Sequence, residues 1–233
     1  MTDGKYVVSW SGGKDSCLAL YESLKQGYEV SHLVNFISHG PKRVRFHGTF
    51  AGLIQGQSDA MGIPLVQKET SWKGYEEDFK KTISGLKAQG VTGMIFGDIY
   101  VQEHLEWVER VCSEIGIRAM EPLWGRDPKD LLTSFLSSGF EAVVVCAKEN
   151  IVERDWIGKK VDRAFMEYLG QKGIDFCGEN GEYHTLVIDG PIFSKRLSLI
   201  HDGIVDLDGY YLLNTPDYRL EESKKAKPVP SSS

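Results

Sequence analysis

The sequence predicts an α/β fold in which a mostly parallel, doubly wound sheet is followed by a smaller C-terminal α+β subdomain. Two observations predict the sheet: apolar strand segments alternate with amphipathic helical segments, and a glycine-rich turn joins the first strand to the first helix. In the last third, short segments broken by Gly, Asp and Pro replace this alternation. Doubly wound sheets bind ligands at the carboxyl ends of their strands, so we expect a site at that first turn.

The elements of the first part follow from local patterns. Short apolar runs predict strands over residues 6–10, 30–36, 64–68, 93–96 and 142–147. In the first helix Cys17, Leu20, Tyr21 and Leu24 recur at helical spacing, and Gly27 ends the run. Similar patterns predict helices over residues 14–26, 49–61, 75–89, 102–115 and 128–137.

The last third predicts a second unit. We expect a helix over residues 159–169 and short antiparallel strands over 185–188, 197–201 and 209–213. The expected domains are therefore a nucleotide-binding α/β domain over residues 1–124 and an acceptor-binding subdomain over 125–220. Residues 221–233 hold few apolar side chains and two prolines, which predicts a flexible tail.

Composition limits the classes of function. The chain of 233 residues carries a net charge of −6, which argues against a nucleic-acid partner because such binding usually needs a basic face. The four cysteines are far apart, which excludes the usual zinc and iron–sulfur spacings. We see neither a signal peptide nor a membrane-spanning apolar run, and we expect a cytoplasmic protein with reduced thiols. The pattern leaves open whether the chain forms a homo-oligomer.

The sharpest local feature is the segment 9–16 (SWSGGKDS), between the first strand and the first helix. Its two glycines let the backbone approach an anion, its serines and lysine add donors and charge, and the helix N-terminus points at the same place. An aspartate beside phosphates is explained if it holds Mg²⁺. The candidate ATP-binding residues are Ser9, Trp10, Ser11, Gly12, Gly13, Lys14, Asp15 and Ser16.

Two commoner phosphate loops are excluded. A Walker loop requires glycine where this chain has Val8, and Ser or Thr where it has Asp15. The dinucleotide fingerprint GxGxxG is absent from this turn. The alternative is a glycine-rich turn with a solvated lysine.

The segment resembles the PP-loop of the N-type ATP pyrophosphatases, whose signature is SGGxDS. The resemblance implies a Rossmann-like ATP pyrophosphatase fold in which Ser11–Ser16 holds the β- and γ-phosphates of ATP. It also implies cleavage of ATP to AMP and pyrophosphate, with Lys14 and Asp15 as catalytic residues.

A second block runs from Cys177 to Pro191 (CGENGEYHTLVIDGP). Glu179 and Glu182 lie in a glycine-containing turn next to Tyr183, and two carboxylates with an aromatic ring predict a cradle for a cationic ligand. The alternative is a solvated acidic turn before a strand.

Together with residues 96–99 (FGDI) and 121–124 (EPLW), these blocks resemble the diphthine–ammonia ligase (diphthamide synthase) family. The resemblance implies amidation of diphthine on translation elongation factor 2, with ATP, Mg²⁺ and ammonia, through an acyl-adenylate. Glu182 is then a third catalytic candidate, and the acceptor-binding candidates are Glu179, Glu182, Tyr183 and His184. The family has Glu where this chain has His184, which leaves the acceptor chemistry open.

Three further residues lie at predicted strand ends. Asn35 is a candidate contact for adenine or ribose, Gly97 allows close approach of a nucleotide, and Asp98 is a candidate ligand for Mg²⁺ or the acceptor. For each, the alternative is an ordinary turn residue. His47, after a basic run, is a candidate phosphate contact or a solvated loop residue.

Two other functions share the loop. A tRNA sulfur-transferase would need paired cysteines or an iron–sulfur site, and a basic surface, none of which this sequence offers. An ATP-binding module without turnover remains the third possibility. The length leaves no room for a glutaminase domain, so we expect free ammonia, or another protein, to supply nitrogen.

Overall fold

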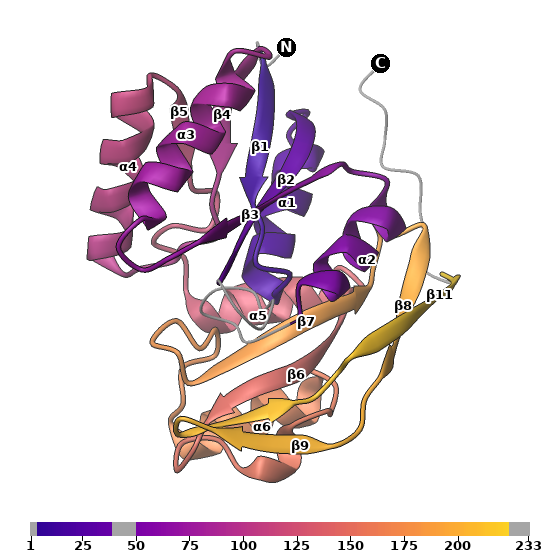
Figure 1. Ribbon diagram of the computed structural model, residues 1–233. Coiled ribbons are helices and arrows are strands. Elements are labelled where there is room, and N and C mark those ends of the chain that lie inside the picture. The colour runs from indigo at the N-terminus through magenta and orange to yellow at the C-terminus, as the bar shows by residue number, and fades with distance from the viewer. Residues whose placement is uncertain (1–3, 39–49, 224–233) are drawn as a thin grey trace.

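The computed structural model of the protein describes residues 4–38 and 50–223 (Figure 1). Its first unit is a five-stranded sheet with strand order β3-β2-β1-β4-β5, and all neighbours are parallel. The strands are β1 (Lys5–Ser9), β2 (Glu29–Ser38), β3 (Leu65–Thr70), β4 (Val91–Ile95) and β5 (Arg118–Met120). The chain builds outward from β1 on one side and restarts at β4 on the other, so the strand order reverses beside β1.

Helices cover both faces of this sheet (Figure 1). Successive side chains of a strand point to opposite faces, and the neighbours Val7 and Val8 of β1 accordingly belong to two different apolar clusters. The Val8 cluster includes residues of α1 (Lys14–Lys25) and α2 (Ala51–Met61), and the Val7 cluster residues of α3 (Tyr75–Lys87) and α4 (Gln102–Ile115). The structure confirms the doubly wound α/β fold.

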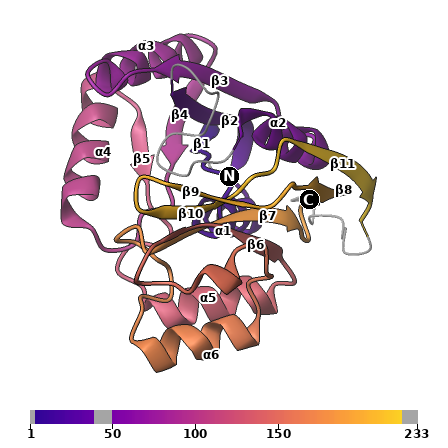
Figure 2. The ribbon, with the colours of Figure 1, turned by 60° about the horizontal axis from the view of Figure 1, so that its bottom comes forward.

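The second unit is an antiparallel sheet with order β7-β6-β10-β9. Two helices, α5 (Pro128–Ser137) and α6 (Arg163–Lys172), lie against it, as Figure 2 shows. Its strands are β6 (Glu141–Lys148), β7 (Tyr183–Asp189), β9 (Ile204–Leu207) and β10 (Tyr210–Leu213), and a 3-10 turn, η1 (Arg154–Trp156), precedes α6. The helix expected from residue 159 begins at Arg163 instead, because the Asp162 side chain caps it by accepting the Phe165 N–H at 3.0 Å.

A two-stranded ribbon of β8 (Lys195–Ile200) and β11 (Asp217–Glu222) returns to the first unit. It packs on α2 so closely that a Cβ atom on Gly56 would lie 2.5 Å from the Tyr218 ring. Glu221 and Glu222 pair with β8, so the strand runs two residues into the segment expected to be flexible. The division of the chain at residues 124 and 125 stays a prediction.

Two of the expectations from the sequence concern residues that the structure does not describe. His47 and the part of the tail after residue 223 lie outside the described residues. Among the helices that the structure does describe, none is long and apolar enough to cross a membrane.

Candidate active site

The glycine-rich segment forms a tight connection between β1 and α1. Ser9 is the last residue of β1, Gly13 is the N-cap of α1, and Lys14 begins the helix. Gly12 has φ +83°, and a Cβ atom there would lie 2.5 Å from the Cδ1 atom of Ile54. Glycine alone adopts this positive φ without strain and has no Cβ atom to clash with Ile54. Gly12 therefore allows the tight turn from β1 into α1.

The segment is anchored from behind by buried amides. The Trp10 indole donates to the Gln57 side-chain oxygen at 2.8 Å, and the Gln57 amide donates to the Gly12 carbonyl at 2.9 Å and to the Val187 carbonyl at 2.7 Å. Asn35 donates to the Trp10 carbonyl at 2.8 Å and accepts from Gln67 at 3.0 Å. Asn35 therefore links the loop to β3, and it also lines the cavity, so the nucleotide contact expected from the sequence stays a prediction.

The loop lines a cavity of about 780 Å³ at the carboxyl edge of the sheet, where the strand order reverses. The opposite wall is the turn from Cys177 to Thr185 in the second unit. An aromatic and aliphatic wall completes it, made of Phe36, Tyr75, Phe96, Val101, Trp107 and Val108. The structure thus brings together the two sequence blocks that were singled out, although 160 residues separate them.

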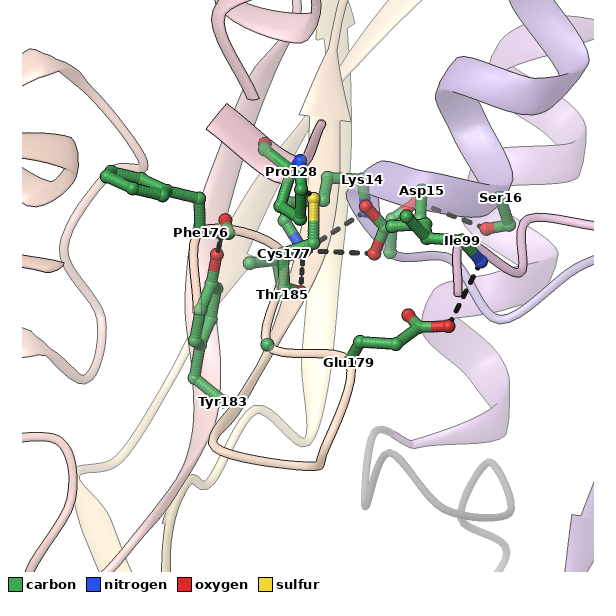
Figure 3. Close-up of polar contacts among 12 residues, drawn as sticks. Lys14, Asp15, Ser16, Ile99, Pro128, Phe176, Cys177, Glu179, Tyr183 and Thr185 are labelled. Carbon is green, nitrogen blue, oxygen red and sulfur yellow. Dashed lines mark hydrogen bonds and ion pairs between the residues drawn. The ribbon is translucent and has the colours of Figure 1, made fainter. Parts of the chain in front are cut away.

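Lys14 carries a buried positive charge at the centre of this arrangement (Figure 3). Its ammonium group lies 2.9 Å from Asp15 Oδ2, donates to the Cys177 carbonyl, and sits 4.8 Å from the centroid of the Tyr183 ring. Burial opposes the charge, but attraction to the Asp15 carboxylate together with smaller contributions from Tyr183 and Cys177 outweighs it, and the pKa of Lys14 is raised above its usual value. The lysine is therefore protonated near pH 7.

Asp15 and Glu179 both line the cavity, and burial raises the pKa of both carboxyl groups. Burial raises the pKa of Asp15 against the opposing pull of Lys14. Burial also raises the pKa of Glu179 to about 7, with repulsion from Asp15 and Asp98 adding to it. The Glu179 side chain accepts a hydrogen bond from the Ile99 N–H at 3.1 Å, which fixes its direction (Figure 3).

Gly97 lines the cavity and also lies close to the backbone of the loop, while the close approach of a nucleotide stays a prediction. A Cβ atom there would lie 2.9 Å from both the carbonyl carbon of Asp15 and the amide nitrogen of Ser16. The next residue, Asp98, lines the cavity and contacts the Nδ1 atom of His104 at 3.0 Å. Both expected strand-end residues therefore lie beside the loop.

The remaining acceptor-binding candidates differ in their position relative to the cavity. His184 lines the cavity, and burial lowers its pKa to about 4, so it is neutral near pH 7. Tyr183 is only 1% exposed, and its ring supports Lys14 while its hydroxyl donates to the Phe176 carbonyl. A buried ring under a lysine does not form the open cradle that the sequence predicted.

Glu182 lies elsewhere. Its carboxylate accepts the Asn180 N–H at 3.0 Å, and it faces a separate surface hollow that Tyr168 and Tyr211 also line. Gly181, with φ +80°, turns the chain between Glu179 and Glu182, so the two carboxylates do not converge. The expectation that they form one pocket is wrong for the structure as described.

Two residues that shape the site were not predicted from the sequence. Thr185 accepts the Lys14 backbone N–H at 3.0 Å, and Gln57 braces the loop, but both signals depend on contacts far apart in sequence. The aromatic wall had no local signature either. Aromatic residues at helical spacing, as in α3 and α4, are as typical of a hydrophobic core as of a binding cavity.

Comparison with known families agrees with this geometry. Residues 4–119 match the family described as "Diphthamide synthase N-terminal domain", and residues 127–214 match "Diphthamide synthase C-terminal domain". The chain belongs to the diphthamide synthase family. The two family domains contribute the two facing walls of the cavity, the loop in the first and the 177–185 turn in the second.

Individual relatives of the diphthamide synthase family extend this result. The chain is 27% identical over 217 residues to a human protein named diphthine--ammonia ligase, covering 80% of this chain and 79% of that protein. The Bos taurus protein of that name is 26% identical with the same coverage. The match to the Schizosaccharomyces pombe protein covers 84% of this chain but 36% of that longer protein. A crystal structure described as a predicted subunit of tRNA methyltransferase from Methanocaldococcus jannaschii superposes with a TM-score of 0.42 at 15% identity, covering 79% of this chain and 96% of that one.

Proposed function

We propose that this chain is an ATP-dependent ligase that amidates diphthine on translation elongation factor 2 to diphthamide, using ammonia. The observation that carries the proposal is the cavity in which the loop with its buried, charged Lys14 faces the turn with Glu179 and His184. One wall is suited to the phosphates of ATP and the other to an acceptor. The relatives named diphthine--ammonia ligase support the same acceptor class.

The reaction balances as two displacements. The carboxylate of diphthine attacks the α-phosphorus of ATP, which forms an acyl-adenylate and expels pyrophosphate. Ammonia then attacks the acyl carbon, loses a proton, and expels AMP. Charge collects on the leaving pyrophosphate, so we assign Lys14 and the hydroxyls of Ser11 and Ser16 to stabilise it.

Mg²⁺ fits the donors that the loop offers. The Asp15 side chain is 26% exposed and lines the cavity, and carboxylate oxygen is a preferred ligand of Mg²⁺. We assign Asp15 to hold the ion directly or through water. When bound, it would neutralise charge on the pyrophosphate oxygens.

On the acceptor side, Glu179 and His184 are two of the turn residues that line the cavity with polar side chains. We assign them to the acceptor and remove Glu182 from the catalytic set, because its carboxylate points to a different hollow.

The cysteines weigh against sulfur transfer. All four are free and buried, and burial raises the pKa of Cys112 to about 12 and that of Cys17 and Cys177 well above the usual value. Since the thiolate is the reactive form, the structure offers no thiol suited to carry sulfur.

The test is mass spectrometry of elongation factor 2 bearing diphthine, after incubation with the chain, Mg-ATP and ammonium. We expect conversion of the acid to the amide with release of AMP and pyrophosphate, and loss of both in Lys14→Met. The control is Lys25→Met, an exposed lysine in the last turn of the same helix, which should keep full activity. ATP cleavage without amide formation would retain the ATP chemistry and reject diphthine as the acceptor. ATP binding without cleavage would favour a non-catalytic module.

A further inference from the structure

A group of metal-ligating side chains lies in the cavity wall beside the loop. One ligand atom each from Asp98, His104 and Glu179 lies within 4.8 Å of the other two. The residues come from three places: the segment after β4, the helix α4, and the 177–185 turn. We propose that Asp98, His104 and Glu179 bind a divalent transition-metal cation at the mouth of the cavity.

Within the cluster His104 Nδ1 lies 3.0 Å from Asp98 Oδ1, a contact that an ion would replace, and the bonds around the cluster leave other ligand atoms available. Tyr100 donates to Asp175 at 3.0 Å, and Asn180 donates to the Tyr100 oxygen at 3.0 Å. The Ile99 N–H engages only the Oε1 atom of Glu179, which leaves Oε2 as a ligand. These bonds fasten the turn to the segment after β4, so Glu179 is already held near Asp98.

The carboxyl groups of Asp15, Asp98 and Glu179 line the cavity together with one lysine and two histidines of the described residues. Both carboxylate oxygens of Glu121 are buried and, among the described residues, have no hydrogen-bond partner. Repulsion between Glu121 and Asp98 contributes to the raised pKa of Glu121. Lys14 is the one buried lysine of the described cavity wall, and Asp15 already pairs with it. A cation at the cluster would offset the remaining charge.

The donor set selects the kind of ion. Two carboxylates with one imidazole suit Mn²⁺, Fe²⁺, Co²⁺ or Zn²⁺ better than Mg²⁺, which prefers oxygen ligands alone. Three protein ligands also leave coordination positions for water or for a ligand oxygen. His104 is about half exposed, so an ion can reach it from solvent.

A role follows if the proposed function holds, although the site itself rests only on geometry. The acceptor carboxylate and ATP are both anionic, and the cavity wall already holds Asp15, Asp98 and Glu179. An ion between Asp98 and Glu179 would turn a repulsive wall into one that holds a carboxylate near the loop.

The experiment measures metal binding without ATP or acceptor, so its failure leaves the proposed function untouched. Mn²⁺ is titrated into the chelator-treated chain and followed by electron paramagnetic resonance, and Co²⁺ binding is followed by visible absorption. We expect one ion per chain, and at least ten-fold weaker binding in His104→Asn, because even lost outer-shell partners cost 10–100-fold in affinity. His201→Asn, an exposed histidine outside the cluster, is the matched control and should bind as the parent does.

Two further variants separate this site from the loop. Asp15→Asn should keep the Mn²⁺ stoichiometry, and Glu179→Gln should lower affinity as His104→Asn does. Loss of the ion in Asp15→Asn together with unchanged binding in His104→Asn would overturn the proposal in favour of a loop site. No Mn²⁺ binding in the parent would overturn it as well.

Discussion

The backbone N–H of Lys14 donates a hydrogen bond to the side-chain hydroxyl of Thr185 at 3.0 Å, across 171 residues of sequence. The first N–H of α1 is thus satisfied by a strand of the second unit. The neighbouring Val187 N–H donates to the Gly12 carbonyl at 2.9 Å. The conformation of the phosphate loop therefore depends on the docking of the two units.

Removing this hydroxyl should damage the loop. Thr185→Val keeps the side-chain shape but leaves the buried Lys14 N–H without its partner, which we expect to cost about 1–3 kcal/mol in the free energy of unfolding. ATP affinity should fall as well, because the loop loses a fixed point. Urea denaturation and ATP-binding calorimetry measure the two effects.

Thr185→Ser is the control for this change, because it retains the hydroxyl and should keep ATP affinity close to the parent value. Equal ATP affinity in the Val and Ser variants would show that the hydrogen bond does not shape the loop.

Gly97→Ala tests the close approach of the segment after β4 to the loop. The new Cβ atom would lie 2.9 Å from backbone atoms of Asp15 and Ser16, which cannot move aside as a flexible side chain can. We expect ATP affinity to fall at least ten-fold and stability to fall by about 1–3 kcal/mol. Gly85→Ala in α3 is the control, since a Cβ atom there meets nothing within 4 Å and alanine favours the helix by about 1 kcal/mol. An ATP affinity unchanged in Gly97→Ala would reject the steric explanation.

The parts of the site that could be predicted from the sequence are formed by residues adjacent in the chain. The loop between β1 and α1 is local, so its glycines, lysine and helix N-terminus were readable together. The failure at Glu182 has a different origin: Gly178 and Gly181 both have positive φ, and the direction of side chains around such turns does not follow from spacing. Strand β5 escaped notice because it has three residues, too few to show a period.

Contacts between residues far apart in sequence could not be predicted from local patterns. Thr185 was expected only as the start of a strand, and nothing in its neighbours indicates that β7 packs against the loop. The contact is made by the hydrogen bonds of the Lys14 and Val187 N–H groups, which join residues more than 170 positions apart.

His184 should stay neutral through the physiological range. Burial lowers its pKa from 6.5 to about 4, so the folded state resists its protonation. A depressed pKa of this kind contributes stability above pH 6.5 that is lost as the pH falls toward 4. The free energy of unfolding of the parent should therefore decline more steeply over that range than that of His184→Gln, and an NMR titration of the His184 ring should give a midpoint near pH 4. A midpoint near 6.5 would contradict the buried environment.

Glu121 should give the opposite dependence on pH. Its carboxyl is held without hydrogen-bond partners among the described residues, and burial followed by repulsion from Asp98 raises its pKa from 4.5 to about 7. A carboxyl with a raised pKa contributes stability below pH 4.5 that is lost as the pH rises through 7. The advantage in stability of Glu121→Gln over the parent should therefore grow between pH 4.5 and 8. Urea denaturation at both ends of that range, in chelator without added metal, measures the difference. Parallel pH profiles for the two proteins would mean that Glu121 titrates alike in the folded and unfolded states.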